Sequence, residues 1–320
     1  MNRDAGIYIA GGTTLLGSAL RTHLQDAGYR NLVGMPPDEP DLSAAGQVED
    51  FFAEARPEYV FHVAGLSGGI HSNQTRPAEL ILDNLLSAAH VIHAAHVHGV
   101  RKLLYVASAC CYPRLAPQPL GVESLMTGPL EPTNAAYATA KLAGWQLCAA
   151  YRQQFGSPFI TAFPANPFGP YDDFSPYSGH VIPSLMRRAY EAKRRNAPDL
   201  VVWGTGTPRR EFIYVSDLAD ACLFVMRHYE STEPINLGGG VDLSIAEVAR
   251  TVSDVVGYRG RIWFDESKPD GVPLKLLDSS PLRSQGWRPA TDFRAALAET
   301  YDWFKHHVVM EGAEHACATV

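Results

Sequence analysis

Residues 6–17 read GIYIAGGTTLLG, and the fold predicted for the chain depends on this stretch. Its first part, residues 6–10, is a short apolar run typical of a buried strand, and a helix is expected at about 16–27. A strand, a glycine-rich turn and a helix N-terminus are typical of dinucleotide binding, because the turn approaches a pyrophosphate and the helix end supplies N–H groups. Thr14 stands where a middle glycine is usual, so a plain tight turn stays an alternative.

Apolar strands and helices alternate along the first half of the chain. The pattern predicts strands and helices in the following ranges: strands at 31–34, 59–64, 102–107 and 159–163, and helices at 44–55, 78–98 and around Tyr137 to about 155. This alternation predicts an α/β fold, a Rossmann-type doubly wound parallel sheet.

The second half of the chain predicts a smaller α/β substrate domain. Residues 164–173 are rich in Pro and Gly and are expected to form a loop. Ser216 or Asp217 is expected to cap a helix that ends near residue 228, and Ser244 to cap the next. The remaining predictions are a basic helix opened by residues 180–183, strands at 201–204, 235–237 and 261–264, and a last helix at 293–306.

The domain boundaries follow from this pattern. We expect the dinucleotide-binding domain at 1–165 with about 212–238, the substrate domain at 166–211 and 239–307, and a mobile tail at 308–320.

Composition excludes several classes of function. Asp and Glu total 34 against 27 Lys and Arg, giving a net charge of −7, so no nucleic-acid partner is expected. No uninterrupted apolar run approaches about 18 residues, so no membrane span is expected. The N-terminus leads directly into a strand without a signal peptide, and the five scattered Cys suit a reducing compartment. A cytoplasmic protein is therefore expected.

A serine and a Tyr-x-x-x-Lys pair suggest carbonyl chemistry. Ser108 follows the strand at 102–107, and Tyr137 and Lys141 lie four apart in an Ala-rich helix, so they share one face. The Lys cation is expected to lower the Tyr pKa, and the two hydroxyls can then hydrogen-bond a carbonyl oxygen and exchange a proton with it.

Basic residues of the second half suit an anionic ligand. Arg188, Arg210 and Lys275 favour a diphosphate, which Arg binds in a bidentate manner. Trp203 is expected either to stack on a base or sugar or to fill the core.

Four histidines, at 90, 93, 96 and 98, lie on the helix at 78–98 and raise the question of a metal site. Their spacing does not place three of them on one tight face with an acid, so we expect no metal and instead a packing or dimer surface. Asn84, on the same helix, is expected to reach back to the active-site strand.

The chain resembles the GDP-L-fucose synthase (GDP-4-keto-6-deoxy-D-mannose 3,5-epimerase/4-reductase) group of the extended short-chain dehydrogenase/reductase family. The segments that carry the resemblance extend to about residue 305: GGIHSN at 68–73, VIHAAH at 91–96, LEPTN at 130–134, SGHVIP at 178–183, WGTGTPRREF at 203–212, SKPDG at 267–271 and KLLD at 275–278.

The resemblance implies roles for individual residues. Ser108, Tyr137 and Lys141 match the reductase triad, Cys110 the epimerisation base and His180 its acid partner. The implied substrate-binding positions are Asn166, Arg188, Trp203, Arg210, Asp270 and Lys275. The implied cofactor-binding positions are Gly11, Thr13, Thr14, Leu15, Leu16, Gly17, Asp41, Leu42, Ala64, Tyr137, Lys141, Pro164, Asn166 and His180.

The chemistry agrees with those roles. A ketone acidifies the C–H bonds on both neighbouring carbons, so a Cys110 thiolate can take a proton and His180 can return one from the opposite face. The enolate oxygen would lie between Tyr137 and Ser108. Cys111 is expected to be a small buried residue.

The resemblance also implies NADP(H), a GDP-sugar substrate and a homodimer. The family has basic residues after the second strand, where this chain has Met35 and Pro37 followed by the acids Asp38 and Glu39. NAD(H) is therefore an alternative cofactor, since the basic residues that would hold a 2′-phosphate are absent.

Two alternatives concern the function itself. One is a related NDP-sugar epimerase or reductase that uses NAD(H) on a different sugar, from a deoxysugar or heptose pathway. The other is a non-catalytic nucleotide-binding protein. The complete set of candidate acids and bases argues against the second alternative.

Overall fold

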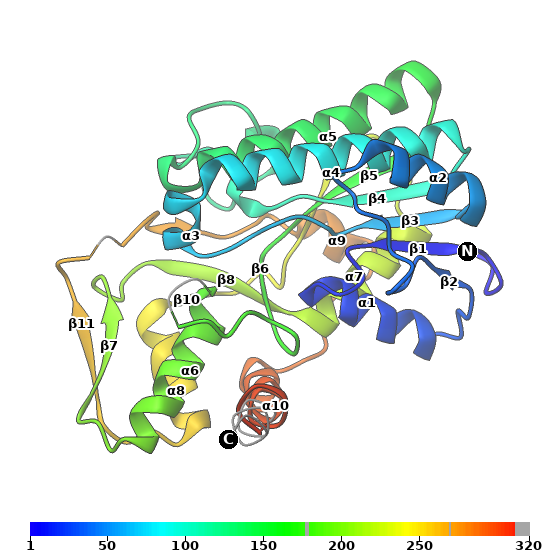
Figure 1. Cartoon of the computed structure of the whole chain (residues 1–320). Coiled ribbons are helices and arrows are strands. Elements are labelled where there is room, and N and C mark those ends of the chain that lie inside the picture. The colour runs from blue at the N-terminus through cyan, green and yellow to red at the C-terminus, as the bar shows by residue number, and fades with distance from the viewer. Residues whose placement is uncertain (177–178, 269, 311–320) are drawn as a thin grey trace.

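The computed structural model describes residues 1–176, 179–268 and 270–310, and a six-stranded sheet forms its centre (Figure 1). The strand order is β2-β1-β3-β4-β5-β9, and every neighbouring pair is parallel. The strands are β1 (Ile7–Ala10), β2 (Leu32–Val33), β3 (Tyr59–His62), β4 (Lys102–Val106), β5 (Phe159–Pro164) and β9 (Ile235–Leu237). The chain changes direction across the sheet between β1 and β3, where α/β sheets bind ligands at the carboxyl ends of their strands.

Helices cover both faces of this sheet, as predicted (Figure 1). One face carries α2 (Ala45–Ala55), α4 (Pro77–Val97) and α5 (Ala135–Phe155), and the other carries α1 (Leu15–Asp26) and α7 (Val215–His228). The doubly wound α/β fold is thereby confirmed. A short helix before α4, α3 (Ile70–Thr75), was not predicted.

Helix α4 is long and apolar enough to cross a membrane by length and composition alone. It packs against α2 and α5 and buries Leu80, Val91 and Ile92, among others, as the core helix of a folded protein does. Its apolar character is thus explained by its place in the core.

Helix α5 lies close to β4 because Gly144 has no side chain. A Cβ at Gly144 would lie 2.3 Å from Cζ of Tyr105, a fully buried residue of β4. The helix ends at Gly156, whose φ of +71° is the left-handed conformation usual after a helix. This contact therefore determines how closely α5 can approach β4.

A second, smaller part of the molecule is built around β8 (Arg209–Tyr214). This strand pairs with β6 (Asn166–Phe168), β10 (Asp242–Ser244) and β12 (Leu274–Lys275). The other elements after residue 180 are β7 (Asp199–Trp203), β11 (Arg261–Asp265), α6 (Val181–Arg194), α8 (Ile245–Val256), α9 (Ser280–Ser284), α10 (Phe293–Phe304) and a π-helical turn at Lys305–Met310. Three 3₁₀ turns lie between β4 and α5: η1 (Ala109–Cys111), η2 (Val122–Ser124) and η3 (Pro132–Asn134). The proposed domain boundaries stay a prediction.

Two predictions about these elements are wrong. The expected loop at 164–173 contains β6, because Asn166–Phe168 pairs with β8. Helix α7 has Tyr214 as its N-cap without a side-chain bond, so neither Ser216 nor Asp217 caps it. The Asp217 carboxylate instead accepts hydrogen bonds from a segment far along the chain, including the N–H of Ala290 at 3.1 Å.

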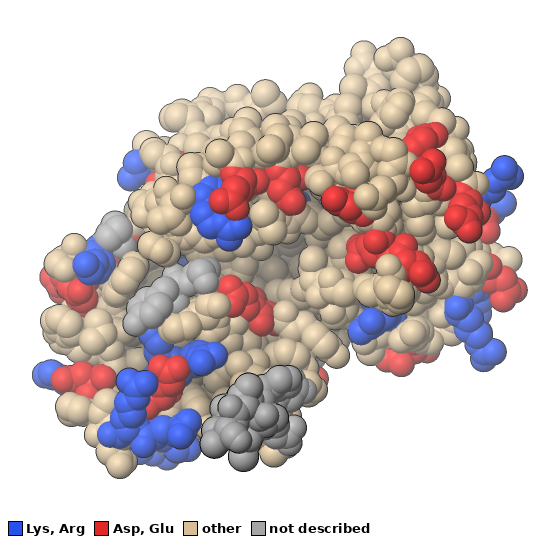
Figure 2. All heavy atoms as spheres, in the orientation of Figure 1, with Lys and Arg blue, Asp and Glu red and all other residues tan. Residues whose placement is uncertain are grey.

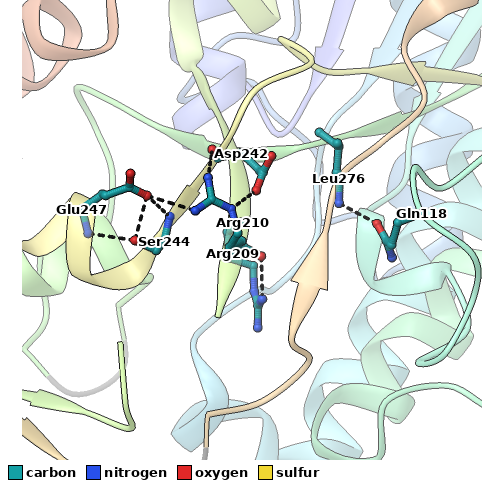
Figure 3. A network of polar contacts seen from close by, with 7 residues as sticks. All are labelled: Gln118, Arg209, Arg210, Asp242, Ser244, Glu247 and Leu276. Atoms are coloured by element: carbon teal, nitrogen blue, oxygen red, sulfur yellow. Dashed lines mark hydrogen bonds and ion pairs between the residues drawn. The ribbon is translucent and has the colours of Figure 1, made fainter. Parts of the chain in front are cut away.

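The predicted cap at Ser244 is confirmed. Ser244 and Glu247 form a capping box, in which each side chain bonds the backbone N–H of the other (Figure 3). Arg209 pairs with Glu247 and with Asp242 of the neighbouring strand, which fastens α8 to β8 (Figure 3). Two other predictions fall partly outside the described residues: the SGHVIP and SKPDG motifs, at Ser178 and Pro269, and the tail, at 311–320.

Candidate active site

A cavity of about 620 Å³ lies at the carboxyl ends of the central strands, and the surface is hollowed between the two parts of the molecule (Figure 2). All five candidate catalytic residues line it: Ser108, Cys110, Tyr137, Lys141 and His180. The other predicted positions that line it are Thr14, Leu15, Leu16, Ala64, Pro164, Asn166, Arg188, Trp203, Arg210, Asp270 and Lys275. The predicted positions outside its lining are Gly11, Thr13, Gly17, Asp41 and Leu42.

Ser108 connects two parts of the site. It follows β4 and caps η1, and its Oγ accepts a hydrogen bond from the N–H of Cys110 at 3.2 Å. The Ser108 side chain also acts on the pKa of Tyr137. Burial raises the pKa of Tyr137, and the Ser108 side chain opposes that rise. The expected lowering of the Tyr137 pKa by Lys141 is therefore wrong for this structure, because burial has the larger effect.

Lys141 is a buried cation. Its Nζ donates to the carbonyl of Ala64 at 3.0 Å and lies 5.9 Å from the ring centroid of Tyr137. Burial lowers the pKa of Lys141 to about 8. Such a lysine exchanges its proton with little free-energy cost at a pH near 8.

Asn84 reaches the loop after β3 and not the strand before Ser108 to which it was expected to reach. Its Nδ2 donates to the carbonyl of Leu66 at 2.9 Å, across 18 residues. Gly65 lies against it with a φ of +125°, and a Cβ there would be 2.1 Å from Oδ1 of Asn84 and 3.2 Å from Nζ of Lys141. Only glycine therefore fits between Asn84 and Lys141.

Cys110 has two polar neighbours from distant segments. Nδ2 of Asn134 donates to its Sγ at 3.1 Å, and Nζ of Lys275 lies 4.0 Å from the same sulfur. Cys111 is fully buried, its Sγ faces the carbonyl of Ala138 at 3.6 Å, and burial raises its thiol pKa. The two adjacent cysteines thus have opposite environments, as expected for Cys111.

His180 precedes α6 and faces an acid that the sequence reasoning did not identify. Its Nδ1 lies 3.7 Å from Oδ1 of Asp172. Although burial disfavours the imidazolium, Asp172 and the charge of Asp173 together raise the pKa of His180. The acid form of His180 is therefore the one that its surroundings favour.

The second part of the molecule supplies the basic side chains. Nη1 of Arg188 donates to the carbonyl of Val201 at 2.9 Å, and burial lowers the pKa of Arg210. Asp270 holds the turn after β7, since it accepts bonds from the N–H of Thr205 at 2.7 Å and from its Oγ1 at 2.9 Å. Trp203 is 48% exposed, so the core-filling alternative for it is wrong.

The first turn fits a dinucleotide. A Cβ at Gly17 would lie 1.9 Å from the carbonyl oxygen of Gly11, so α1 can approach the turn only with glycine at 17. Thr14 caps α1 through its side chain, which accepts the N–H of Gly17 at 3.1 Å. Oε1 of Glu39 accepts the N–H of Gly11 at 2.7 Å. An acid therefore lies beside the turn.

The four histidines of α4 each have a different partner. Their Nδ1 or Nε2 atoms bond the carbonyl of Leu42, the hydroxyl of Tyr151, the hydroxyl of Ser157 and the carboxylate of Glu49. The described residues contain no group of three His, Cys, Asp or Glu placed to hold a metal ion. These side chains attach α4 to its neighbours.

Asn134 and Asp172 were not identified from the sequence. Asn134 and Asp172 each lie within a segment that the reasoning had quoted for another reason. Their partners are at least eight residues away along the chain, so no local pattern signals the contact.

A Rossmann sheet with a glycine-rich first turn, a Ser after β4 and a Tyr-x-x-x-Lys pair on the neighbouring helix α5 defines a nucleotide-dependent enzyme of the short-chain dehydrogenase/reductase class. The chain belongs to the NAD dependent epimerase/dehydratase family, whose model matches residues 7–238.

Individual relatives agree with this assignment. GDP-L-fucose synthase 1 of Arabidopsis thaliana is 48% identical, covering 96% of this chain and 95% of its own. GDP-L-fucose synthase of Escherichia coli strain K12 is 47% identical, covering 93% and 96%. A GDP-L-fucose synthetase structure from Naegleria fowleri, bound to NADP, is 31% identical with a TM-score of 0.89 and covers 97% of each chain. The resemblance deduced from the sequence motifs is confirmed.

Proposed function

We propose that the protein converts a GDP-4-keto-6-deoxy-hexose by epimerisation and 4-keto reduction with NADP(H), forming GDP-L-fucose. One observation carries the proposal: Cys110 and His180 line the same cavity as Ser108, Tyr137 and Lys141. A simple carbonyl reductase has no need for an additional thiol base and imidazolium acid. The names of the similar proteins and the NADP in the related structure support the choice of sugar nucleotide and cofactor.

The epimerisation step uses residues that face one ketone. The Cys110 thiolate removes a proton from a carbon next to the carbonyl, forming S–H as the C–H electrons move into the enolate. Tyr137 and Ser108 hydrogen-bond the enolate oxygen. The His180 imidazolium then protonates the carbon from the opposite face and becomes neutral. Exchange with water restores both groups.

The reduction step uses the same carbonyl. When bound, the nicotinamide supplies the hydride that converts the keto carbon into an alcohol carbon. Tyr137 gives the alcohol oxygen its proton and becomes a tyrosinate, and the Lys141 cation beside it stabilises that negative charge. The turn at residues 11–17 and the N-terminus of α1 would hold the pyrophosphate of this cofactor.

The GDP moiety fits the second part of the cavity. Arg188, Arg210 and Lys275 are the basic side chains assigned to the diphosphate, and Trp203 presents an exposed ring to the base or sugar. The homodimer and the cytoplasmic location stay predictions.

A second candidate uses NAD(H) on a related sugar nucleotide. Residues 31–43 contain no Arg or Lys, and the Glu39 carboxylate lies on the amide of Gly11. An acid at this position suits a ribose hydroxyl better than a 2′-phosphate.

The test is an incubation with GDP-4-keto-6-deoxy-mannose and either NADPH or NADH. Absorbance loss and product stereochemistry report reduction, and exchange of sugar protons in deuterated water reports epimerisation. Formation of GDP-L-fucose with NADPH supports the proposal. If neither cofactor is oxidised and no proton exchanges, the proposal is wrong. Faster oxidation of NADH favours the second candidate.

A further inference from the structure

We propose that Asn134 is the positioning residue of Cys110, and that its side-chain amide turns over as the sulfur changes between thiolate and thiol. The inference rests on the proposed role of Cys110 as the epimerisation base. It assigns the residue that bonds the sulfur of this base in both of its protonation states.

The side chain of Asn134 contacts the sulfur of Cys110 directly. Nδ2 of Asn134 donates to Sγ of Cys110 at 3.1 Å. An amide nitrogen only donates, so the sulfur is the acceptor in this orientation, as a thiolate would be. Nζ of Lys275, 4.0 Å from the same sulfur, adds a favourable charge.

In addition, Asn134 makes no helix cap. It is the N-cap residue of α5, but its side chain forms no capping bond. Asn is among the best capping residues, and a cap of this type contributes about 1 kcal/mol. The side chain gives up this stabilisation and points to the sulfur of Cys110 instead.

The oxygen of the same amide is free to take part in a second arrangement. Oδ1 of Asn134 is buried and has no hydrogen-bond partner within the part of the chain that the structure describes. A half-turn of the amide would place Oδ1 on the sulfur, where it can accept the S–H of the thiol, and it would break no other bond of Oδ1. The same side chain therefore serves both protonation states of the base.

The position of Asn134 also links Cys110, the proposed epimerisation base, to Tyr137, which is proposed to bond the carbonyl. It lies three residues before Tyr137, so one turn at the start of α5 carries both side chains. The main chain of Cys110 is held by Ser108 and its sulfur by Asn134. The base and the tyrosine that bonds the carbonyl thus have a fixed relative position.

Alkylation of Cys110 by iodoacetamide tests the proposal without any substrate. The rate is measured from pH 5.5 to 10 by peptide-resolved mass spectrometry for the wild type, Asn134→Ala and the isosteric Asn134→Asp. Loss of a hydrogen bond to a charged sulfur predicts a rate at neutral pH that is lower by about tenfold or more in Asn134→Ala. Asn134→Asp is expected to be slower still, since a carboxylate accepts from S–H and repels the thiolate.

Three buried cysteines serve as internal controls. Cys111, Cys148 and Cys222 are buried, so they stay unreactive while the fold is intact. If these cysteines become reactive in Asn134→Ala, the fold of that variant is disturbed. The isosteric Asn134→Asp variant then tests the role of Asn134 in its place. An unchanged Cys110 pH profile in a folded variant overturns the proposal.

Catalytic assays separate this inference from the proposed function. In Asn134→Ala, exchange of the sugar C–H in deuterated water is expected to fall about tenfold or more, whereas binding of NADPH stays unchanged. Equal loss of exchange and of cofactor binding would indicate a structural role and overturn the inference. Failure of the wild type to exchange sugar protons refutes the proposed function, while the alkylation profiles still decide the role of Asn134.

Discussion

Replacement of Lys141 by Met is expected to abolish catalysis without the loss of stability usual for a buried site. Burial lowers the pKa of Lys141 from 10.5 to about 8, which corresponds to a cost of about 3 kcal/mol for holding the cation in the folded state. Met fills the same space without this cost. It leaves the carbonyl of Ala64 without its donor, a loss of about 1–3 kcal/mol. The free energy of unfolding at pH 7 should therefore stay unchanged or rise by up to about 2 kcal/mol.

The stability difference between the wild type and Lys141→Met is expected to change with pH. Below pH 8 the lysine is protonated in both the folded and the unfolded wild type, so its contribution does not vary. Between about pH 8 and 10.5 the folded state releases the proton and the unfolded state keeps it, so wild-type stability rises by about 1.4 kcal/mol per pH unit relative to Lys141→Met. The variant should be the less stable protein at pH 10.

Urea unfolding at pH 7, 8.5 and 10 measures the difference. The matched control is Lys193→Met, since Lys193 also donates to a backbone carbonyl, that of Val256 at 2.8 Å, but is exposed. Its stability difference should be small. A difference for Lys141→Met that does not change with pH, or a loss above about 3 kcal/mol at pH 7, would refute the reasoning.

Three further outcomes follow from particular contacts. Gly144→Ala places a Cβ 2.3 Å from Cζ of Tyr105, so unfolding free energy should fall by about 1–3 kcal/mol and turnover should fall with it; unaltered turnover and stability would contradict the packing. Asp172→Asn removes the charge that raises the His180 pKa, so the alkaline limb of the proton-exchange rate should move to lower pH in a pH–rate profile. An unmoved limb would exclude Asp172 as the cause. Ser244→Ala removes half of the capping box and should lower the urea midpoint by an amount equivalent to about 1 kcal/mol, with cofactor affinity as the control that stays constant.

The sequence was sufficient for the elements that carry strong local signals. Three elements are predicted by their own hydrophobic pattern or by their glycines: the turn at 11–17, the strand before Ser108 and the helix of Tyr137 and Lys141. The structure contains all three. Their assembly at one edge of the sheet follows from parallel topology.

The wrong predictions concern residues whose structure depends on contacts with distant parts of the chain. The segment 164–173 reads as a loop because Pro167 interrupts it, yet Asn166–Phe168 pairs with β8 more than 40 residues later. Asp217 looked like a cap, but its carboxylate bonds a segment 73 residues away. Burial of Tyr137 likewise depends on the whole fold, which explains the wrong direction of its expected pKa change.

The single hydroxyl of Ser108 accepts the N–H of Cys110, and the same side chain acts on the pKa of Tyr137. In evolutionary terms, this double role means that the two activities of the site do not vary independently. A substitution at Ser108 that tunes proton removal also disturbs the tyrosine that donates to the alcohol. Descendants that keep only one activity are therefore expected to change Cys110 or His180 first, and to retain the serine.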